Sequence, residues 1–309
     1  MWLAGFCFLK IWKEAIIVLG KKWRIMSSGN EFSVTPMNRM IELVPGGTYT
    51  FSVTVSNPVN SAENFDYKAY AAPYSVVTEE YDADVMTKTD HTRMADWITI
   101  VKPTGTLAPN ETKDIEFTIT VPENAPGGGQ YAAIIVGADD KDEVNGNTAV
   151  TNVLEIASIL YAKVDGEIIH KGEVLENNVP GFLTDPKINV SSLIANEGNM
   201  HEIASIAITA KNVFTGETIA SAELENGAYA ELILPDSQRF INKEINELPM
   251  IGIINVQQDI YYNGETSTVE KNVIVCPIWF LVLLALTLMA IVWKIVKNIR
   301  KHKKKKTVQ

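Results

Sequence analysis

The sequence predicts an all-β protein: two tandem Ig-like β-sandwich domains followed by one C-terminal transmembrane α-helix. From Glu31 onwards, apolar and polar residues alternate in many short runs separated by Gly, Pro and Asn turns, which is typical of antiparallel sandwiches. Residues 273–293 then hold 21 positions without a charge. The predicted parts are an N-terminal segment (1–29), a first sandwich (30–164), a second sandwich (165–272), a span (273–293) and a basic tail (294–309).

The apolar stretch 273–293 is long enough, as a helix rising about 1.5 Å per residue, to cross the hydrocarbon core of a bilayer. Trp279 and Trp293 lie near its two ends, where indole rings favour the headgroup layer. Basic residues follow at once, beginning with Lys294, Lys297 and Arg300. Because positive residues stay on the cytoplasmic side, we expect a single-pass protein with a cytoplasmic C-terminus and an extracellular N-terminal part.

The N-terminal segment is apolar in patches that Lys10, Lys13 and Glu14 interrupt. It lacks the order of basic region, unbroken apolar region and small-residue cleavage site that a signal peptide has. It could be an atypical signal peptide, a signal anchor, or residues upstream of the true start.

The charge is unevenly distributed along the chain, whose net charge is −10. Residues 294–309 carry +8 and residues 1–26 carry +4, so residues 27–293 carry about −22. Such an acidic surface disfavours nucleic acid and favours basic partners or cations. The two cysteines, Cys7 and Cys276, lie outside the predicted sandwiches, so the sandwiches depend on their cores and not on disulfides.

The strands of the first sandwich are predicted from period-two alternation. In TYTFSVTVSNP, the apolar residues Tyr49, Phe51, Val53 and Val55 share one face. The run QYAAIIVGAD is apolar at nearly every position, which predicts a strand covered on both faces. The polar stretch 79–96 predicts a loop with a short helical turn.

The second block predicts eight further strands, the last of which runs almost directly into the membrane helix. Asn263-Gly264 is a two-residue hairpin signal between the last two of them. The expected ranges are 168–175, 187–195, 203–212, 218–224, 228–234, 239–245, 252–262 and 267–275.

The residues that could carry chemistry do not form a recognisable catalytic pattern. The four histidines have no metal-binding spacing, and there is no GxSxG, P-loop or GxGxxG sequence. We therefore predict no enzyme, no catalytic residues, no cofactor and no resident metal. The acidic loop 139–147 leaves two alternatives open, a calcium site made of clustered oxygens or a solvated hairpin loop.

Two loops are candidate ligand-contact surfaces, because binding residues often lie on loops held by a rigid sandwich. The first is the stretch 79–96, directly before Trp97, and the second is the acidic loop 139–147, and a plain surface role is the alternative for each. The candidate contact residues are Glu79, Tyr81, Asp82, Trp97, Asp139, Asp140 and Asp142.

Several stretches carry a resemblance to a known family. These are EFSVTP near residue 31, VPGGTYTFSVTVSNP, LAPNETKDIEFTITVPENAPGGGQYAAIIVG, and LIANEGNMHEIASIAITAKNVFTGE with its N-x-G-N-x-H turn. With the C-terminal span and basic tail, the arrangement resembles the WxL-interacting proteins of Gram-positive bacteria. The resemblance covers most of residues 30–306. It implies a peptidoglycan-binding first sandwich, a second sandwich that binds a host or partner, and WxL-domain surface proteins as partners.

Two functions follow as expectations. The first is a membrane-anchored, non-enzymatic cell-surface protein that attaches to cell-wall peptidoglycan, to surface partner proteins, or to both. The second is a structural or accessory subunit of a membrane-tethered surface or secretion assembly, in which sheet edges pair with neighbouring chains.

Overall fold

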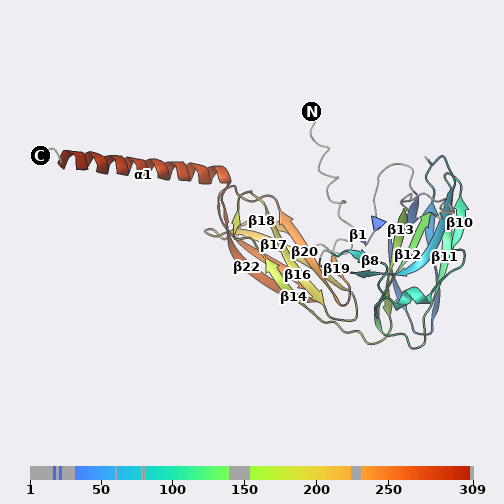
Figure 1. Ribbon diagram of the computed structural model, residues 1–309. Coiled ribbons are helices and arrows are strands. Elements are labelled where there is room, and N and C mark those ends of the chain that lie inside the picture. Colours follow the sequence, from blue (N-terminus) through green and yellow to red (C-terminus); the bar gives the residue numbers. More distant parts are fainter. Residues whose placement is uncertain are drawn as a thin grey trace. The chain divides into compact units, whose positions relative to one another are not determined.

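The computed structural model describes residues 17–18, 21–22, 32–59, 61–77, 79, 81–138, 154–223 and 231–306. It confirms the predicted class, a mostly β-sandwich protein with one apolar C-terminal helix (Figure 1). The chain forms two compact units. Unit 1 comprises Met1–Glu173, Ile194–Ile203 and Leu232–Phe240, and unit 2 comprises Val174–Leu193, Ala204–Glu231 and Ile241–Gln309. The limits 30–164 and 165–272 remain our proposal for the two sandwiches.

The first sandwich, in unit 1, consists of a five-stranded sheet and a four-stranded sheet, ordered β10-β6-β12-β13-β4 and β3-β5-β11-β9. β4 pairs parallel to β13, and the other pairings described in these two sheets are antiparallel. β3 and β4 belong to different sheets, and the chain changes sheet at Pro36. The strands are β3 (Ser33–Thr35), β4 (Asn38–Leu43), β5 (Thr48–Ser56), β6 (Phe65–Pro73), β9 (Ile98–Ile100), β10 (Thr104–Leu107), β11 (Thr112–Thr120), β12 (Gly128–Ala138) and β13 (Glu155–Val164).

The core of this sandwich lies between the two sheets. Val53 and Val55 of β5 and Phe117 of β11 are almost fully buried, while their sequence neighbours face outwards. The period-two pattern therefore predicted the buried face correctly, because side chains alternate across a strand.

β12 is buried on both faces, as its continuous apolar run predicts. Ala132, Ile134 and Val136 face the core between the sheets. Tyr131, Ala133 and Ile135 belong to a second cluster on the outer face of the five-stranded sheet. That outer face is covered by the loop that follows β6.

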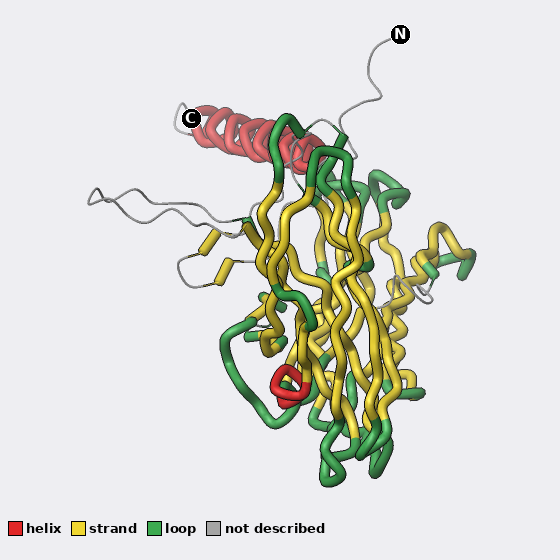
Figure 2. The backbone as a smooth tube through the Cα atoms, turned by 90° about the vertical axis from the view of Figure 1, so that its right-hand side faces the viewer, coloured by secondary structure: helices red, strands yellow, loops and turns green. Residues whose placement is uncertain are grey.

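The loop between β6 and β9 contains two short strands and a helical turn. The strands β7 (Ser75–Val76) and β8 (Ala83–Asp84) pair with each other, and the turn is η1 (Arg93–Trp97), red at one end of the sheets in Figure 2. This agrees with the predicted loop and helical turn. Two further strands, β1 (Ile17–Val18) and β2 (Lys21–Lys22), pair with each other near the N-terminus.

The second sandwich has a three-stranded sheet, β14-β16-β20, and a sheet ordered β15-β22-β21-β17-β18, in which β19 also pairs with β17. Each of the eight predicted strands has a counterpart. The strands are β14 (Gly172–Asn178), β15 (Phe182–Leu183), β16 (Ile188–Asn196), β17 (Glu202–Asn212), β18 (Thr218–Ala222), β19 (Glu231–Ile233), β20 (Ser237–Ile245), β21 (Gly252–Tyr262) and β22 (Glu265–Val275).

The turn between β21 and β22 is the predicted Asn263-Gly264 hairpin. Both residues have positive φ, 49° and 75°, as a type I′ turn requires. The tight turn fixes the register of the whole ladder, from Tyr262 opposite Glu265 to Gly252 opposite Val275.

The predicted start of the C-terminal helix is corrected. Helix α1 spans Ile278–Lys306, and residues 273–275, expected in the helix, complete β22. Val273 and Val275 are buried in the sandwich core and pair with β21, so burial in the sheet competes successfully with helix formation. Only Cys276 and Pro277 separate strand from helix.

Candidate binding surface of the loop between Tyr81 and Trp97

The predicted contact loop packs much of its own length against the protein. Ala83, Thr92 and Met94 are buried, and Tyr81 and Val85 pack on the outer face of the five-stranded sheet. The loop is therefore partly a structural element of unit 1. The side chains that remain exposed between these anchors form the free surface.

Tyr81 holds the loop to the segment Leu232–Phe240 of the same unit. Its backbone has φ 68°, and its hydroxyl oxygen accepts the N–H of Leu234 at 2.8 Å. The guanidinium of Arg239 lies over the ring, 4.1 Å from the centroid, and Arg239 also donates to the carbonyl of Leu232 at 2.7 Å. Burial raises the pKa of the Tyr81 hydroxyl, so it stays neutral at physiological pH.

The other predicted contact residues in the loop have different positions. The carbonyl of Glu79 accepts the N–H of Phe240 at 3.0 Å, and the carbonyl of Asp82 accepts the N–H of Val77 at 3.0 Å. Glu79, Tyr81 and Asp82 thus lie together beside the β7–β8 hairpin. Trp97, at the end of η1, instead packs against the core between the sheets. Their role in ligand contact stays a prediction.

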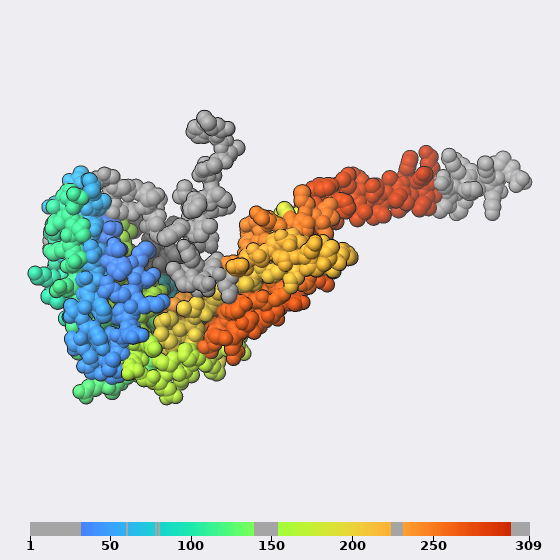
Figure 3. Space-filling view, turned by 180° about the vertical axis from the view of Figure 1, so that it is seen from behind, coloured from blue at the N-terminus to red at the C-terminus, as the bar shows by residue number. Residues whose placement is uncertain are grey.

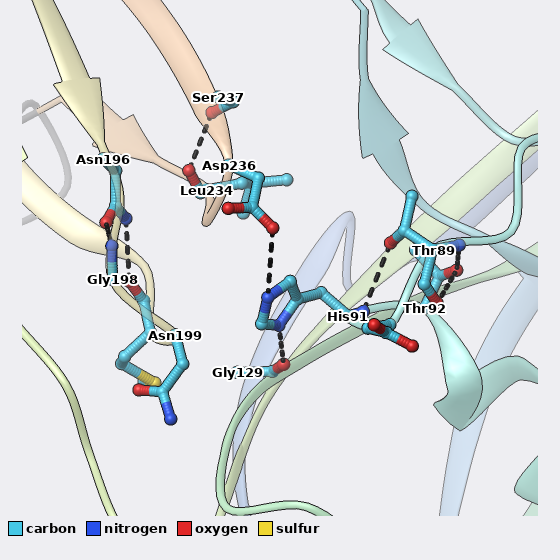
Figure 4. A network of polar contacts seen from close by, with 12 residues as sticks. Thr89, His91, Thr92, Gly129, Asn196, Gly198, Asn199, Leu234, Asp236 and Ser237 are labelled. Atoms are coloured by element: carbon cyan, nitrogen blue, oxygen red, sulfur yellow. Dashed lines mark hydrogen bonds and ion pairs between the residues drawn. The ribbon is translucent and has the colours of Figure 1, made fainter.

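His91 connects three segments of unit 1 (Figure 4). Its Nδ1 lies 3.1 Å from the carbonyl oxygen of Gly129, and since a carbonyl only accepts, Nδ1 carries the hydrogen. Its Nε2 lies 3.5 Å from a carboxylate oxygen of Asp236, which is largely exposed. The backbone carbonyl of His91 accepts the N–H of Tyr131 at 2.8 Å.

Asn199 belongs to the N-x-G-N-x-H turn and attaches it to the start of β12. Its carbonyl accepts the N–H of Gly129 at 2.7 Å, and its side-chain amide donates to the carbonyl of Gly127 at 3.2 Å. A Cβ on Gly128, whose φ is +112°, would lie 2.4 Å from the Asn199 carbonyl oxygen. Glycine is required there because the two backbones touch.

Asn196 closes the same turn from within. Its side-chain amide donates to the carbonyl of Met200 at 2.7 Å and to that of Ile233 at 2.9 Å. Its side-chain oxygen accepts the N–H of Gly198 at 2.9 Å (Figure 4). The N-x-G-N-x-H turn is thus held in place by hydrogen bonds of its backbone and of its two asparagine side chains.

The last residue of the turn, His201, meets a cluster of tyrosines. Its N–H donates to the hydroxyl of Tyr131 at 2.9 Å, and its Nδ1 lies 3.1 Å from the same hydroxyl. Tyr161 packs edge-on against both rings, and Tyr74 edge-on against Tyr161. Burial lowers the pKa of His201 and raises that of Tyr131, so both are neutral and the hydroxyl donates to Nδ1.

The exposed crest of the loop is small and charged. It includes Met86, Lys88, Asp90, Arg93 and Asp96, and between them the exposed Thr87 and Thr89. Met86 is 77% exposed, the Lys88 ammonium lies 2.7 Å from the Asp96 carboxylate, and Arg93 pairs with Asp90. The two exposed ion pairs can rearrange at little cost, which suits a surface that contacts a partner.

The side chains of this surface provide hydrogen-bonding and charged groups that could bind a ligand. Among the described residues, no group of three or more His, Cys, Asp or Glu side chains could hold a metal ion. The acidic loop with Asp139, Asp140 and Asp142 lies outside the described residues, so its calcium alternative stays open. Sequence reasoning missed His91, Tyr131 and Arg239, since their roles depend on partners far along the chain.

The predicted membrane anchor lies on α1, where Ile278–Lys297 is long and apolar enough to cross a membrane. Trp279 packs edge-on against Phe280, and the Lys297 ammonium lies 4.8 Å from the centre of the Trp293 ring. Lys294 follows Trp293 directly. Arg300 lies further along the helix, and its side chain is outside the described part. In Figure 3 the helix is the red segment that continues from unit 2.

Comparison with known proteins identifies one domain. Residues 42–147 match the family model of an Fn3-like domain. No curated protein is significantly similar to this chain. These findings define a chain with an Fn3-like, Ig-type β-sandwich domain, and they do not bear on the resemblance to WxL-interacting proteins.

Several solved structures are similar at low identity. The class 5 fimbriae chaperone CfaA is 15% identical, covering 80% of this chain and 100% of its own, with a TM-score of 0.36. The SafB chaperone in complex with the SafA pilin of Salmonella enterica is 13% identical, covering 81% of this chain and 99% of its own, with a TM-score of 0.36. The CsuC–CsuE chaperone–tip subunit complex of Acinetobacter baumannii is 10% identical, covering 80% of this chain and 99% of the matched chain, with a TM-score of 0.36. TM-scores this low do not indicate a shared function.

Proposed function

We propose that this protein is a non-enzymatic binding protein of the cell surface, anchored in the membrane by α1. One observation carries the proposal: a β-sandwich continues, after two residues, into a helix whose large apolar side chains are exposed throughout the described stretch 278–296. An exposed apolar surface of this length is unfavourable in water and favourable in a bilayer. The basic residues follow only at the far end of the helix, which supports a cytoplasmic tail and an outward-facing sandwich.

The ligand we propose is cell-wall peptidoglycan, together with surface proteins of the WxL type. The sequence resemblance supports this choice, and the exposed crest around Met86 supplies a contact surface on the Fn3-like domain. A bilayer anchor at one end and a wall contact on unit 1 would tie the wall to the membrane. No bond is made or broken in such a role.

Co-sedimentation with purified cell-wall sacculi tests the wall ligand. The full chain in detergent is mixed with sacculi at low and high salt, and we expect it to pellet at both. The double variant Met86→Ser/Arg93→Ser should bind at least about 5-fold more weakly, about 1 kcal/mol. Val59→Ser is the matched control, because Val59 is also exposed, at 73% against 77% for Met86.

A full chain that stays in the supernatant at both salt concentrations refutes the wall ligand. Pelleting only at low salt indicates charge attraction alone. If the double variant binds as strongly as the wild type, the wall contact does not lie on the exposed crest of the loop.

The alternative, an accessory subunit of a membrane-tethered assembly, has one favourable observation. The four-stranded sheet of unit 1 ends in two three-residue strands, β3 and β9. In the described pairing β3 covers only Thr54–Ser56 of the nine-residue β5, and such an edge could accept a strand from another chain. Co-purification of a defined membrane protein, without wall binding, would favour this function.

A further inference from the structure

Several segments of unit 2 end at the level where α1 begins. β17 and β22 run in the same direction on either side of β21, with Asn212, Ile254 and Val273 in one row across the sheet. β15 pairs in parallel with the last two residues of β22. The turn after β17, the turn before β21 and the strand β15 therefore lie at the same end of the sheet as the start of the helix.

Large apolar side chains are exposed at this level, and we call them the membrane-proximal rim. Their exposed fractions are between 41% and 82%, the highest being that of Phe214. The rim consists of Phe182, Phe214, Met250, Ile251, Ile253 and Ile274. The first two residues of the helix, Ile278 and Trp279, are also exposed and continue it.

The apolar character of the outer sheet face stops after one row. Ile253 lies opposite Ile274 in the β21–β22 ladder, and the next pair on the same face is Asn255 with Asn272, whose side-chain amides are 3.2 Å apart. The following pair on this face, Gln257 with Glu270, is polar too. On this face of the β21–β22 ladder, the apolar pair at the helix end is thus followed by two polar pairs, and the next exposed large apolar side chain of β21 is Tyr261, at the opposite end of the strand.

Phe214 is presented by a rigid turn. The side-chain oxygen of Asn212 accepts the N–H of Phe214 at 2.8 Å and that of Thr215 at 3.3 Å. The carbonyl of Asn212 accepts the N–H of Gly216, and its own N–H donates to the carbonyl of Glu217. These four hydrogen bonds fix the turn, so the exposed ring has little conformational entropy to lose on insertion.

The length of the charge-free part of the helix is consistent with such a rim. Its charge-free part runs from Ile278 to Trp293, which at 1.5 Å per residue is about 24 Å. The hydrocarbon core is about 30 Å thick, so a helix with Lys294 at the inner boundary begins about 6 Å inside the outer one.

Ile274 lies at most about 14 Å along the chain from Ile278, and therefore at most about 8 Å outside the hydrocarbon. That distance is within the headgroup layer, which is about 5–8 Å thick on each side. Asn272 lies two residues further out, about where the layer ends. The change from isoleucine to asparagine thus coincides with the change from lipid to water.

We propose that the membrane-proximal rim inserts into the headgroup layer and upper acyl chains of the outer leaflet, so that unit 2 rests on the bilayer. The inference depends on the proposed membrane span. The rim adds apolar surface beyond the charge-free part of the helix, and the two linker residues Cys276 and Pro277 leave little slack. The N–H of Cys276 donates to the carbonyl of Leu183 at 2.9 Å, which holds β15 against this junction.

Lipid quenching of a site-specific fluorophore tests the proposal in the full chain. Cys7 and Cys276 are replaced by alanine, and one cysteine carrying the dye NBD is introduced at Ile253 or Phe214. The protein is reconstituted in phosphatidylcholine vesicles with or without lipids that carry a nitroxide near the top of the acyl chain. We expect at least 2-fold quenching at both positions.

The matched control is Tyr261→Cys, on the same strand and the same face as Ile253. The two positions are comparably exposed, at 38% and 41%, and they are about 26 Å apart along the strand. We expect no measurable quenching at Tyr261. A probe at Leu284, in the helix, reports whether the span itself is inserted.

The outcomes separate the two hypotheses. Quenching at Leu284 but at neither rim position overturns the rim and leaves the membrane anchor intact, as when a second copy or another protein covers these residues. Absence of quenching at Leu284 overturns the membrane anchor and the rim with it. In a second variant, Phe214→Asn/Met250→Asn, we expect the probe at Ile253 to lose at least half of its quenching while Leu284 is unchanged. Unchanged quenching at Ile253 in this variant argues against the rim.

Discussion

Removal of the Tyr131 hydroxyl tests whether the Tyr131–His201 contact holds the N-x-G-N-x-H turn in place. Tyr131 is 1% exposed, and its hydroxyl makes two hydrogen bonds with His201, one to the backbone N–H and one to Nδ1. Tyr131→Phe keeps the ring and leaves both groups of His201 without this partner in a buried site. Such a loss costs about 1–3 kcal/mol.

The assay is amide hydrogen exchange of the full chain in detergent micelles, because local opening can be read segment by segment. A cost of 1–3 kcal/mol corresponds to about 5- to 150-fold faster exchange in Ile194–Ile203. Global unfolding is less suitable, since a chain with two units need not unfold in a single step.

The matched control is Tyr49→Phe. The Tyr49 hydroxyl accepts the N–H of Val44 at 3.0 Å in an exposed turn, where water can replace it. We expect a change below about 0.5 kcal/mol, and therefore about 2-fold in exchange. If Tyr131→Phe changes the exchange of Ile194–Ile203 no more than Tyr49→Phe does, the contact does not hold the turn.

Three further predictions concern unit 1. Burial lowers the pKa of His201, so the unfolded state binds its proton first; we expect protection of the His201 amide to be complete above about pH 6.5 and to fall as the pH is lowered below it. A pH-independent amide would show that the imidazole is not buried. Arg239→Ala removes the cation above Tyr81 and should cost about 1–3 kcal/mol, measured as faster exchange in the β7–β8 hairpin; Arg239→Lys should recover only part of it. Gly128→Ala should speed amide exchange in Ile194–Ile203 clearly more than Gly264→Ala speeds exchange in the β21–β22 hairpin, because both glycines have positive φ but a Cβ clashes only at Gly128; equal changes would contradict the close contact.

Much of the fold could be predicted because the signals are local. Alternation in β5, the double burial of β12 and the Asn263-Gly264 hairpin each follow from a few adjacent residues, and the structure agrees with all three. The end of β22 was assigned to both strand and helix, because an apolar run fits either. Pairing with β21 decided the first residues in favour of strand.

The candidate site was predicted less completely. The sequence predicts Tyr81 as a ligand-contact residue of the loop, whereas in the structure its hydroxyl and ring contact Leu234 and Arg239, more than 150 positions away. The N-x-G-N-x-H motif was noticed, yet its contact with the start of β12 joins Asn199 to Gly129. These contact partners are far apart in the sequence. Periodicity reports only the direction of side chains within one strand, so it cannot predict such contacts.

By itself the sequence determined which segments are strands, which faces are apolar and where an apolar helix follows, because these depend on alternation, turn residues and an uncharged run. The tertiary structure alone decided which strand ends share a level. That is how Phe214, Met250 and Ile274, far apart in sequence, come to lie at the end of the sheet where α1 begins. It also decided how Tyr131 meets His201. The physical reason is that side-chain direction is set within a few residues, whereas the neighbours across a sheet or a packed loop are set by the path of the whole chain.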